Sequence, residues 1–216
     1  MKYKAVVFDL DGTLLDTLED LADSMNRVLH DRGLPTHPTE AFRYFVGSGA
    51  AVLVSRALPQ EKRNDQLAAD CLEAFRTEYN RNWNNKTKPY EGVSELLDAL
   101  TEKHTRMAIL TNKPQHFAEL CVREFLAGWE FEMIVGQRDG IPMKPDPTGP
   151  RGIARCLDIP LEAFLYLGDS DIDMRTAVDA NMFPVGATWG FRSEKELRES
   201  GAKKTIGRPT ELLELF

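Results

Sequence analysis

The chain has 216 residues, 42% of them hydrophobic and 28% charged, a composition typical of a globular protein with a substantial core. Its formal net charge of −7 argues against nonspecific binding of nucleic acid or of anionic membranes. No apolar run is long enough to span a membrane, and the apolar run directly before Asp9 has only four residues. The three cysteines are widely spaced, so we expect a cytoplasmic protein without a disulfide framework.

The first predicted element is a short apolar strand at residues 5–8, which runs directly into Asp9, Asp11 and Gly12. A carboxylate at the end of a buried strand is costly without a compensating cation or donors, and two carboxylates one residue apart repel. A divalent cation, which takes oxygen ligands, would offset both charges, and Gly12 permits a sharp turn. The alternative is an acidic surface turn, which the apolar residues before Asp9 disfavour.

Residues 17 to about 85 contain helical patterns and no strand between them. Apolar side chains recur at helical spacing from Leu18 to Leu29, with Thr17 as a candidate N-cap. Further helices are predicted at 41–46, from residue 50, and around 67–79, with a break at Gly47-Ser48-Gly49. This pattern predicts a helical insertion at residues 16–87.

From residue 88 onward, helices and strands alternate. Helices are predicted at 92–100, 116–126, 153–157 and 172–180, and strands at 107–110, 133–135, 164–167 and 183–187. Such alternation indicates a parallel sheet with helices on both faces. The predicted architecture is therefore an α/β core of residues 1–15 and 88–216, interrupted after its first strand by the insertion.

Four polar clusters lie at or near predicted carboxyl ends of strands. They are Asp9-Leu10-Asp11, Thr111-Asn112-Lys113-Pro114, Lys144-Pro145-Asp146-Pro147 and Gly168-Asp169-Ser170-Asp171-Ile172-Asp173. Each alone has an ordinary explanation as a turn, a loop or a helix start. Open parallel sheets bind ligands at this edge, so the four clusters together predict one common site.

In this order, the four clusters resemble the four motifs of the haloacid dehalogenase superfamily, whose members are mostly Mg-dependent phosphatases. Thr111-Asn112-Lys113-Pro114, Trp189-Gly190-Phe191-Arg192 and the insertion with Gly47-Ser48-Gly49 are most similar to its phosphoglycolate phosphatase branch. The resemblance covers nearly the whole chain. It implies a Rossmann-like, doubly wound core with a helical cap, and a Mg²⁺-dependent phosphomonoester hydrolase that forms an aspartyl-phosphate.

The resemblance also implies a role for each motif. Asp9 would attack phosphorus, and Asp11 would protonate the leaving alkoxide and then activate the water that cleaves the intermediate. Mg²⁺ would be held by the side chains of Asp9 and Asp169 and by the main-chain carbonyl of Asp11. Thr111 and Lys144 would stabilise charge on the transferring phosphoryl group.

Other residues of these clusters have supporting or external positions. Asn112 would offer the substrate a further donor through its backbone or side chain. Asp173, one helical turn after Asp169, would orient Asp169 or a metal-bound water. A helix N-terminal carboxylate is the alternative for Asp173. We expect Lys113 and Asp171 to face solvent.

Three other functions remain open: a phosphosugar mutase with the same Asp9 chemistry, an inorganic pyrophosphatase, and a noncatalytic phosphate- or protein-binding module. Mutase relatives usually differ around Thr111, and a binding module is expected to lack Asp9 or Asp11. The cap would select the leaving group, with Arg43 or Arg56 as candidates for binding a substrate carboxylate. The expected partner is a small phosphorylated metabolite, with no nucleic acid or membrane, and the chain is expected to be a monomer or homodimer.

Overall fold

The computed structural model describes residues 2–216, and the chain divides into two compact units. We call Met1–Leu15 with Pro89–Phe216 the core unit, and Asp16–Lys88 the insert unit. The chain passes between them twice, and the two crossing segments, β2 (Leu15–Asp16) and β3 (Lys88–Pro89), pair as a two-stranded sheet.

The core unit is built on a six-stranded sheet in the order β5-β4-β1-β6-β7-β8. Its strands are β1 (Ala5–Phe8), β4 (Arg106–Pro114), β5 (Met133–Gln137), β6 (Phe164–Gly168), β7 (Phe183–Ala187) and β8 (Lys204–Ile206), and every neighbouring pair is parallel. β1 lies between β4 and β6, with Val6 opposite both Met107 and Leu165. The chain builds outward first on one side of β1 and then on the other, so the strand order reverses at β1.

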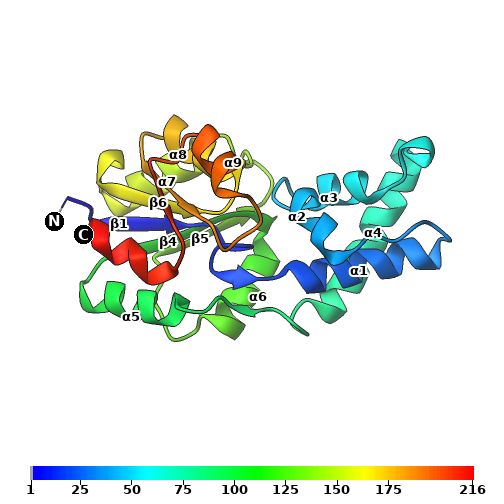
Figure 1. The fold of residues 1–216 in the computed structure, drawn as a ribbon, viewed down its shortest axis with the longest axis horizontal. Coiled ribbons are helices and arrows are strands. Elements are labelled where there is room, and N and C mark those ends of the chain that lie inside the picture. The colour runs from blue at the N-terminus through cyan, green and yellow to red at the C-terminus, as the bar shows by residue number, and fades with distance from the viewer. Residues whose placement is uncertain (1) are drawn as a thin grey trace. The chain divides into compact units, whose positions relative to one another are not determined.

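Helices cover both faces of this sheet. They are α5 (Val93–Glu102), α6 (Gln115–Phe125), α7 (Thr148–Leu157), α8 (Asp171–Asp179) and α9 (Glu194–Glu199), with short 3-10 turns at Leu161–Ala163 and Pro209–Leu215. α5 and α6 lie on one face, and α7 and α8 on the other (Figure 1). Because both faces are covered, β1 is buried at every position and is an unbroken apolar run. The predicted α/β fold class is confirmed.

Several element boundaries differ from the predictions. α7 begins at Thr148, five residues before the predicted start, and β4 continues through Pro114 instead of ending at residue 110. β8 was not predicted. Pro184 is tolerated inside β7 because β8 begins to pair with β7 only at Val185. Proline has no backbone N–H, and at position 184 the pairing with β8 does not require one.

The insert unit is helical. It contains α1 (Leu18–Asp31), α2 (Phe42–Phe45), α3 (Ala50–Ala57) and α4 (Asp65–Asn82), with 3-10 turns at Thr39–Ala41 and Gln60–Lys62, and α1 packs on α4. Thr17 occupies the N-cap position of α1, but its hydroxyl makes no capping hydrogen bond. The buried carboxylate of Asp20 instead accepts the backbone N–H groups of Lys86 and Thr87 and the Thr87 hydroxyl. These bonds join the end of the insert to its first helix.

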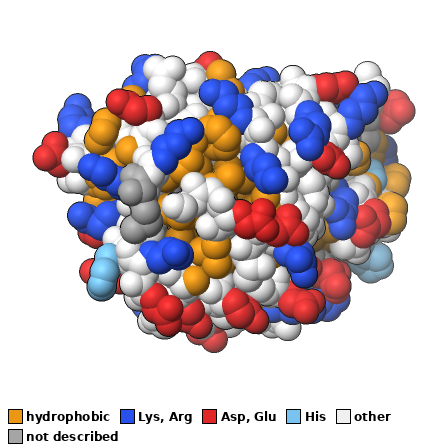
Figure 2. All heavy atoms as spheres, turned by 60° about the vertical axis from the view of Figure 1, so that its left-hand side comes forward, with side chains coloured by type: hydrophobic (Ala, Val, Ile, Leu, Met, Phe, Trp, Pro, Cys, Tyr) orange, Lys and Arg blue, Asp and Glu red, His pale blue; other side chains and the backbone are white. Residues whose placement is uncertain are grey.

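The surface of the core unit mixes charged and apolar side chains, and Figure 2 shows both kinds around an apolar area. A cavity of about 360 Å³ at the amino-terminal edge of the sheet is lined in part by Lys2, Tyr3, Phe183 and Lys203. Both lysine ammonium groups lie 5.8 Å from the centre of the Phe183 ring. Among residues 2–216, no helix is both long enough and apolar enough to cross a membrane.

Candidate active site

The structure brings the predicted site residues of the core unit to the carboxyl edge of the sheet. Asp9 and Asp11 follow β1, and Thr111 and Asn112 lie in the last part of β4. Lys144 lies in the loop between β5 and α7, Asp169 follows β6, and Asp173 lies in the first turn of α8. Parallel strands that end at one edge place side chains from distant parts of the sequence together.

Lys144 is the cation at the centre of this site. Its Nζ lies 2.7 Å from Asp9 Oδ1 and 2.7 Å from Asp173 Oδ1, and its side chain is only 3% exposed. Burial by itself lowers the pKa of Lys144, but the Asp173 and Asp9 carboxylates raise it well above the usual value. Burial, followed by the charge of Asp173, raises the pKa of Asp9 to about 7. One ammonium group therefore offsets only part of the acidic charge.

Asp169 is held by two donors from distant segments. Its Oδ1 accepts the Thr13 hydroxyl at 3.3 Å, and its Oδ2 accepts the Phe191 backbone N–H at 2.7 Å. Burial, with the charges of Asp173 and Asp9, raises the pKa of Asp169 well above its usual value. Gly12 leaves room for this carboxylate, because a Cβ at position 12 would lie 2.3 Å from Asp169 Oδ2.

These acidic residues fit a divalent cation. Asp9, Asp169 and Asp173 are buried and each offers an oxygen, and the three oxygens lie within 4.8 Å of one another. Asp9 Oδ1 forms an ion pair with Lys144 but has no hydrogen bond of good geometry from any residue in the described range 2–216. Both oxygens of Asp173 accept hydrogen bonds, one from Lys144 and one from Ser170. Both oxygens of Asp169 accept hydrogen bonds as well, so Asp9 Oδ1 is the least satisfied oxygen of the cluster and its best candidate for a direct ligand.

Asp173 lies at the helix N-terminus, as the alternative expectation had it, and its side chain contacts Lys144, Ser170 and Tyr166. A role in orienting Asp169 or a metal-bound water stays a prediction. Asp173 is the third residue of α8, where Oδ2 accepts the Ser170 hydroxyl at 2.5 Å and the Ser170 N–H at 3.1 Å in a capping box. Its Oδ1 meanwhile accepts Lys144 Nζ and lies 3.4 Å from the Tyr166 hydroxyl. The helix end thus fixes the carboxylate that holds Lys144.

The expectation that Lys113 faces solvent is wrong. Its side chain is 3% exposed, and Nζ lies 2.9 Å from Oδ1 of Asp11. Because β4 continues through Pro114, strand alternation places Lys113 on the same side as Thr111. The Asp11 carboxylate compensates the buried ammonium group. Asp171 is only partly exposed, at 33%, and pairs with Arg175.

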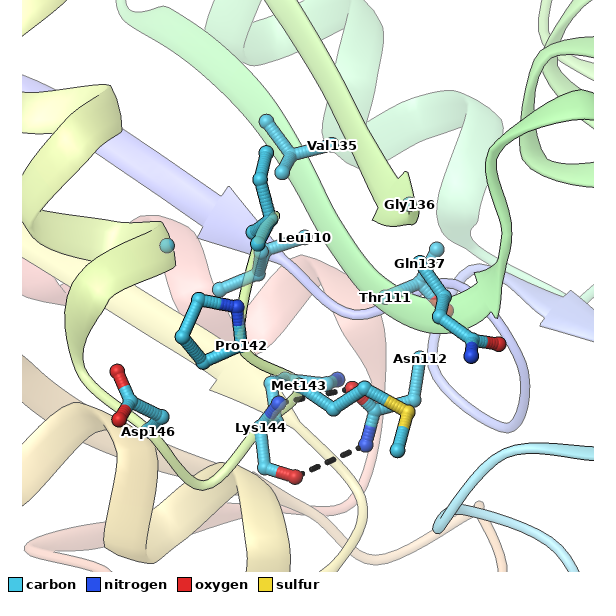
Figure 3. A pocket seen from close by; sticks show the side chains of 12 residues that line it. Leu110, Thr111, Asn112, Val135, Gly136, Gln137, Pro142, Met143, Lys144 and Asp146 are labelled. Atoms are coloured by element: carbon cyan, nitrogen blue, oxygen red, sulfur yellow. Dashed lines mark hydrogen bonds between the residues drawn. The ribbon is translucent and has the colours of Figure 1, made fainter. Parts of the chain in front are cut away.

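Thr111 and Asn112 differ in the way their side chains are used. The Thr111 hydroxyl accepts the Lys113 N–H at 3.2 Å, which leaves its own proton available for an acceptor. The Asn112 amide bonds twice to the main chain of Lys144: Oδ1 accepts the Lys144 N–H at 2.8 Å, and Nδ2 donates to the Lys144 carbonyl at 3.1 Å (Figure 3). Both residues are buried.

The sequence model of the haloacid dehalogenase-like hydrolases matches residues 6–187. The chain belongs to this family. A phosphoglycolate phosphatase of Pseudomonas savastanoi pv. phaseolicola is 34% identical over 207 residues, 94% of this chain and 76% of that protein. A phosphoglycolate phosphatase of Colwellia psychrerythraea is 31% identical over 215 residues, which make up 97% of this chain and 95% of that protein.

A crystal structure agrees with these relatives. It comes from Lactobacillus delbrueckii subsp. bulgaricus and is provisionally described as a phosphoglycolate phosphatase. Its TM-score is 0.93 at 31% identity, with 100% of this chain and 98% of that chain covered. These likenesses confirm the predicted resemblance to the superfamily and to its phosphoglycolate phosphatase branch.

Sequence reasoning missed several residues that build this candidate site. Thr13 and the Phe191 backbone hold Asp169, while Ser170 and Tyr166 contact Asp173. Ser170 had a readable signal, because Ser followed three residues later by Asp at a helix start resembles a capping box. The Phe191 N–H had no signal in the sequence, because every residue except proline carries a backbone N–H.

Proposed function

We propose that this haloacid dehalogenase-like hydrolase is a Mg²⁺-dependent phosphomonoesterase that forms an aspartyl-phosphate on Asp9. The observation that carries the proposal is the buried cluster in which Lys144 Nζ lies 2.7 Å from Asp9 Oδ1, beside the Asp169 and Asp173 carboxylates. A buried nucleophilic carboxylate and a fixed cation suit in-line attack on an anionic phosphoryl group. Phosphatase activity is also what the family relatives support.

The metal ligands would be the side chains of Asp9 and Asp169 and the main-chain carbonyl of Asp11. When bound, Mg²⁺ would supply positive charge against the clustered carboxylates and the phosphoryl oxygens. The side chain of Asp11 is engaged by Lys113 and is not one of the clustered carboxylates found in residues 2–216. To act as the proton donor, the Asp11 carboxyl must carry a proton, so its ion pair with Lys113 would have to break before the first step.

The chemistry has two steps, and atoms balance in each. In the first, an Asp9 oxygen bonds to phosphorus, the ester P–O bond breaks, and Asp11 gives its proton to the leaving alkoxide. In the second, Asp11 takes a proton from water, whose oxygen bonds to phosphorus, and the bond to Asp9 breaks. Lys144 and the Thr111 hydroxyl stabilise the charge on the phosphoryl oxygens in both.

We propose a small phosphorylated metabolite as the substrate, with 2-phosphoglycolate as the leading candidate because the similar relatives are phosphoglycolate phosphatases. The insert unit would act as the cap that selects the leaving group. Within it, Arg43 pairs with Glu40 and Arg56 donates to the Tyr44 carbonyl. A role for either arginine in binding a substrate carboxylate stays a prediction.

The test is phosphate release from a panel of phosphomonoesters, including 2-phosphoglycolate, and from pyrophosphate, with Mg²⁺ and with EDTA. Mg²⁺-dependent release that strongly favours 2-phosphoglycolate is the expected result. Asp9→Asn, purified in parallel, controls for contaminating phosphatases and is expected to release none. Release from pyrophosphate alone, interconversion of sugar phosphates without release, or no reaction with any substrate would overturn the proposal.

A further inference from the structure

We infer that Asn112 is a positioning residue, whose side-chain amide fixes the main chain of Lys144 so that the ammonium group reaches Asp9. The inference rests on the proposed function, because it concerns how that site holds its cation. It assigns the Asn112 side chain to the protein itself, whereas the resemblance implied a contact with the substrate.

The geometry is a two-point pairing of an amide with a peptide. Asn112 Oδ1 accepts the Lys144 N–H at 2.8 Å, and Nδ2 donates to the carbonyl of the same residue at 3.1 Å. A side-chain amide offers an acceptor and a donor side by side, as a neighbouring strand would. Aspartate has the same size but lacks the donor, and alanine has neither group.

Lys144 needs such a restraint because of its place in the chain. It lies in the loop after β5 (Met133–Gln137) and before α7 (Thr148–Leu157), outside any helix or strand. The flanking residues Met143 and Pro145 are exposed, although the Lys144 side chain is buried. Nζ reaches Asp9 and Asp173 from this loop, so a shift of the Lys144 main chain has to be absorbed by the lysine side chain or moves Nζ away from the two carboxylates.

The surroundings of Asn112 favour a fixed clamp. A pocket of about 10 Å³ lies beside it, lined in part by Leu110, Val135 and Ile141 and shown in Figure 3. Such a volume holds one water molecule at most. Few alternative partners can therefore enter to satisfy the Lys144 peptide if the Asn112 amide is removed. The loop would have to move to regain its hydrogen bonds, and Lys144 Nζ would move with it.

The test is a double-mutant cycle on kcat and KM, with p-nitrophenyl phosphate as the probe and saturating Mg²⁺. The single variants are Asn112→Ala and Lys144→Met, and the double variant carries both. Because misplacing a catalytic group by about 1 Å can cost about 100-fold, we expect Asn112→Ala to lower kcat by about 10- to 100-fold. In the Lys144→Met background, the same substitution is expected to change kcat less than twofold.

Additive losses, in which the double variant falls by the product of the two single effects, would overturn the inference. They would mean that Asn112 acts through its own contact with the substrate or through the fold as a whole. Asn112→Asp is the second variant, in case Asn112→Ala does not fold. It keeps the acceptor for the Lys144 N–H, but it replaces the donor with a charged carboxylate oxygen that repels the Lys144 carbonyl. Its effect on kcat is expected to be smaller in the Lys144→Met background than in the wild type.

Gln137→Ala is the matched control, because Gln137 lines the same pocket and is exposed. It removes an amide without touching Lys144 and is expected to leave kcat within twofold. The wild-type rate separates the two proposals. A wild type that hydrolyses no ester refutes the proposed function, whereas an active wild type with an additive cycle refutes only the role of Asn112.

Discussion

Gly12→Ala tests whether the turn after β1 exists to make room for Asp169. Gly12 has a φ of +88°, and a Cβ there would lie 2.3 Å from Asp169 Oδ2 and 2.8 Å from Cε2 of Phe191. Asp169 cannot yield without losing the N–H of Phe191, 2.7 Å away. The substitution therefore combines backbone strain with a steric clash at a candidate metal ligand.

Gly92→Ala separates the two costs. Gly92 belongs to the same unit and has a φ of +87°, but its Cβ would meet Pro209 Cδ at 3.4 Å, an ordinary contact. Each variant bears the left-handed strain of about 1–2 kcal/mol. Overpacking adds a further 1–3 kcal/mol, roughly, for Gly12→Ala alone.

Urea unfolding of both variants in Mg²⁺ measures the difference, and phosphate release measures the site. We expect Gly12→Ala to be less stable than Gly92→Ala by about 1–3 kcal/mol. We also expect it to lose most of its activity, because Asp169 is displaced, while Gly92→Ala keeps its kcat. Equal stability together with full activity of Gly12→Ala would refute the reasoning that the glycine accommodates Asp169.

Three further predictions concern the charges of the site. Mg²⁺ is expected to stabilise the folded protein by about 2.7 kcal/mol at 100 times its Kd, because it offsets the clustered carboxylates, and thereby to raise the melting temperature. Equal melting temperatures in Mg²⁺ and in EDTA would contradict this. Asp9→Asn is expected to abolish turnover yet melt in EDTA no lower than wild type, since it removes one buried charge; measurable turnover in a clean sample would remove Asp9 as the nucleophile. Lys113→Met leaves Asp11 without its cation and is expected to cost about 2–4 kcal/mol in urea unfolding, whereas Lys195→Met, at an 82% exposed side chain, costs under about 0.5. A loss for Lys113→Met as small as that of Lys195→Met would refute the buried ion pair.

The order of strands and polar clusters could be predicted from the sequence, because both are local patterns. An apolar run such as residues 5–8, covered on both faces, needs no tertiary information to be recognised as a buried parallel strand. The rule that parallel strands end at one edge then places Asp9, Thr111 and Asp169 near each other. Short elements without a strong pattern, such as β8 with its three residues, could not be found in this way.

Tertiary structure alone decided which group each of these side chains contacts. Lys113 is buried against a carboxylate 102 positions away, and Asn112 bonds to a peptide 32 positions away. The Phe191 N–H that holds Asp169 comes from a loop 22 residues further along the chain. Such partners depend on where loops return after crossing the sheet, and no periodicity encodes that path. The sequence by itself therefore determined where on the fold the candidate site lies, while the packing of distant loops decided how each charge in it is compensated.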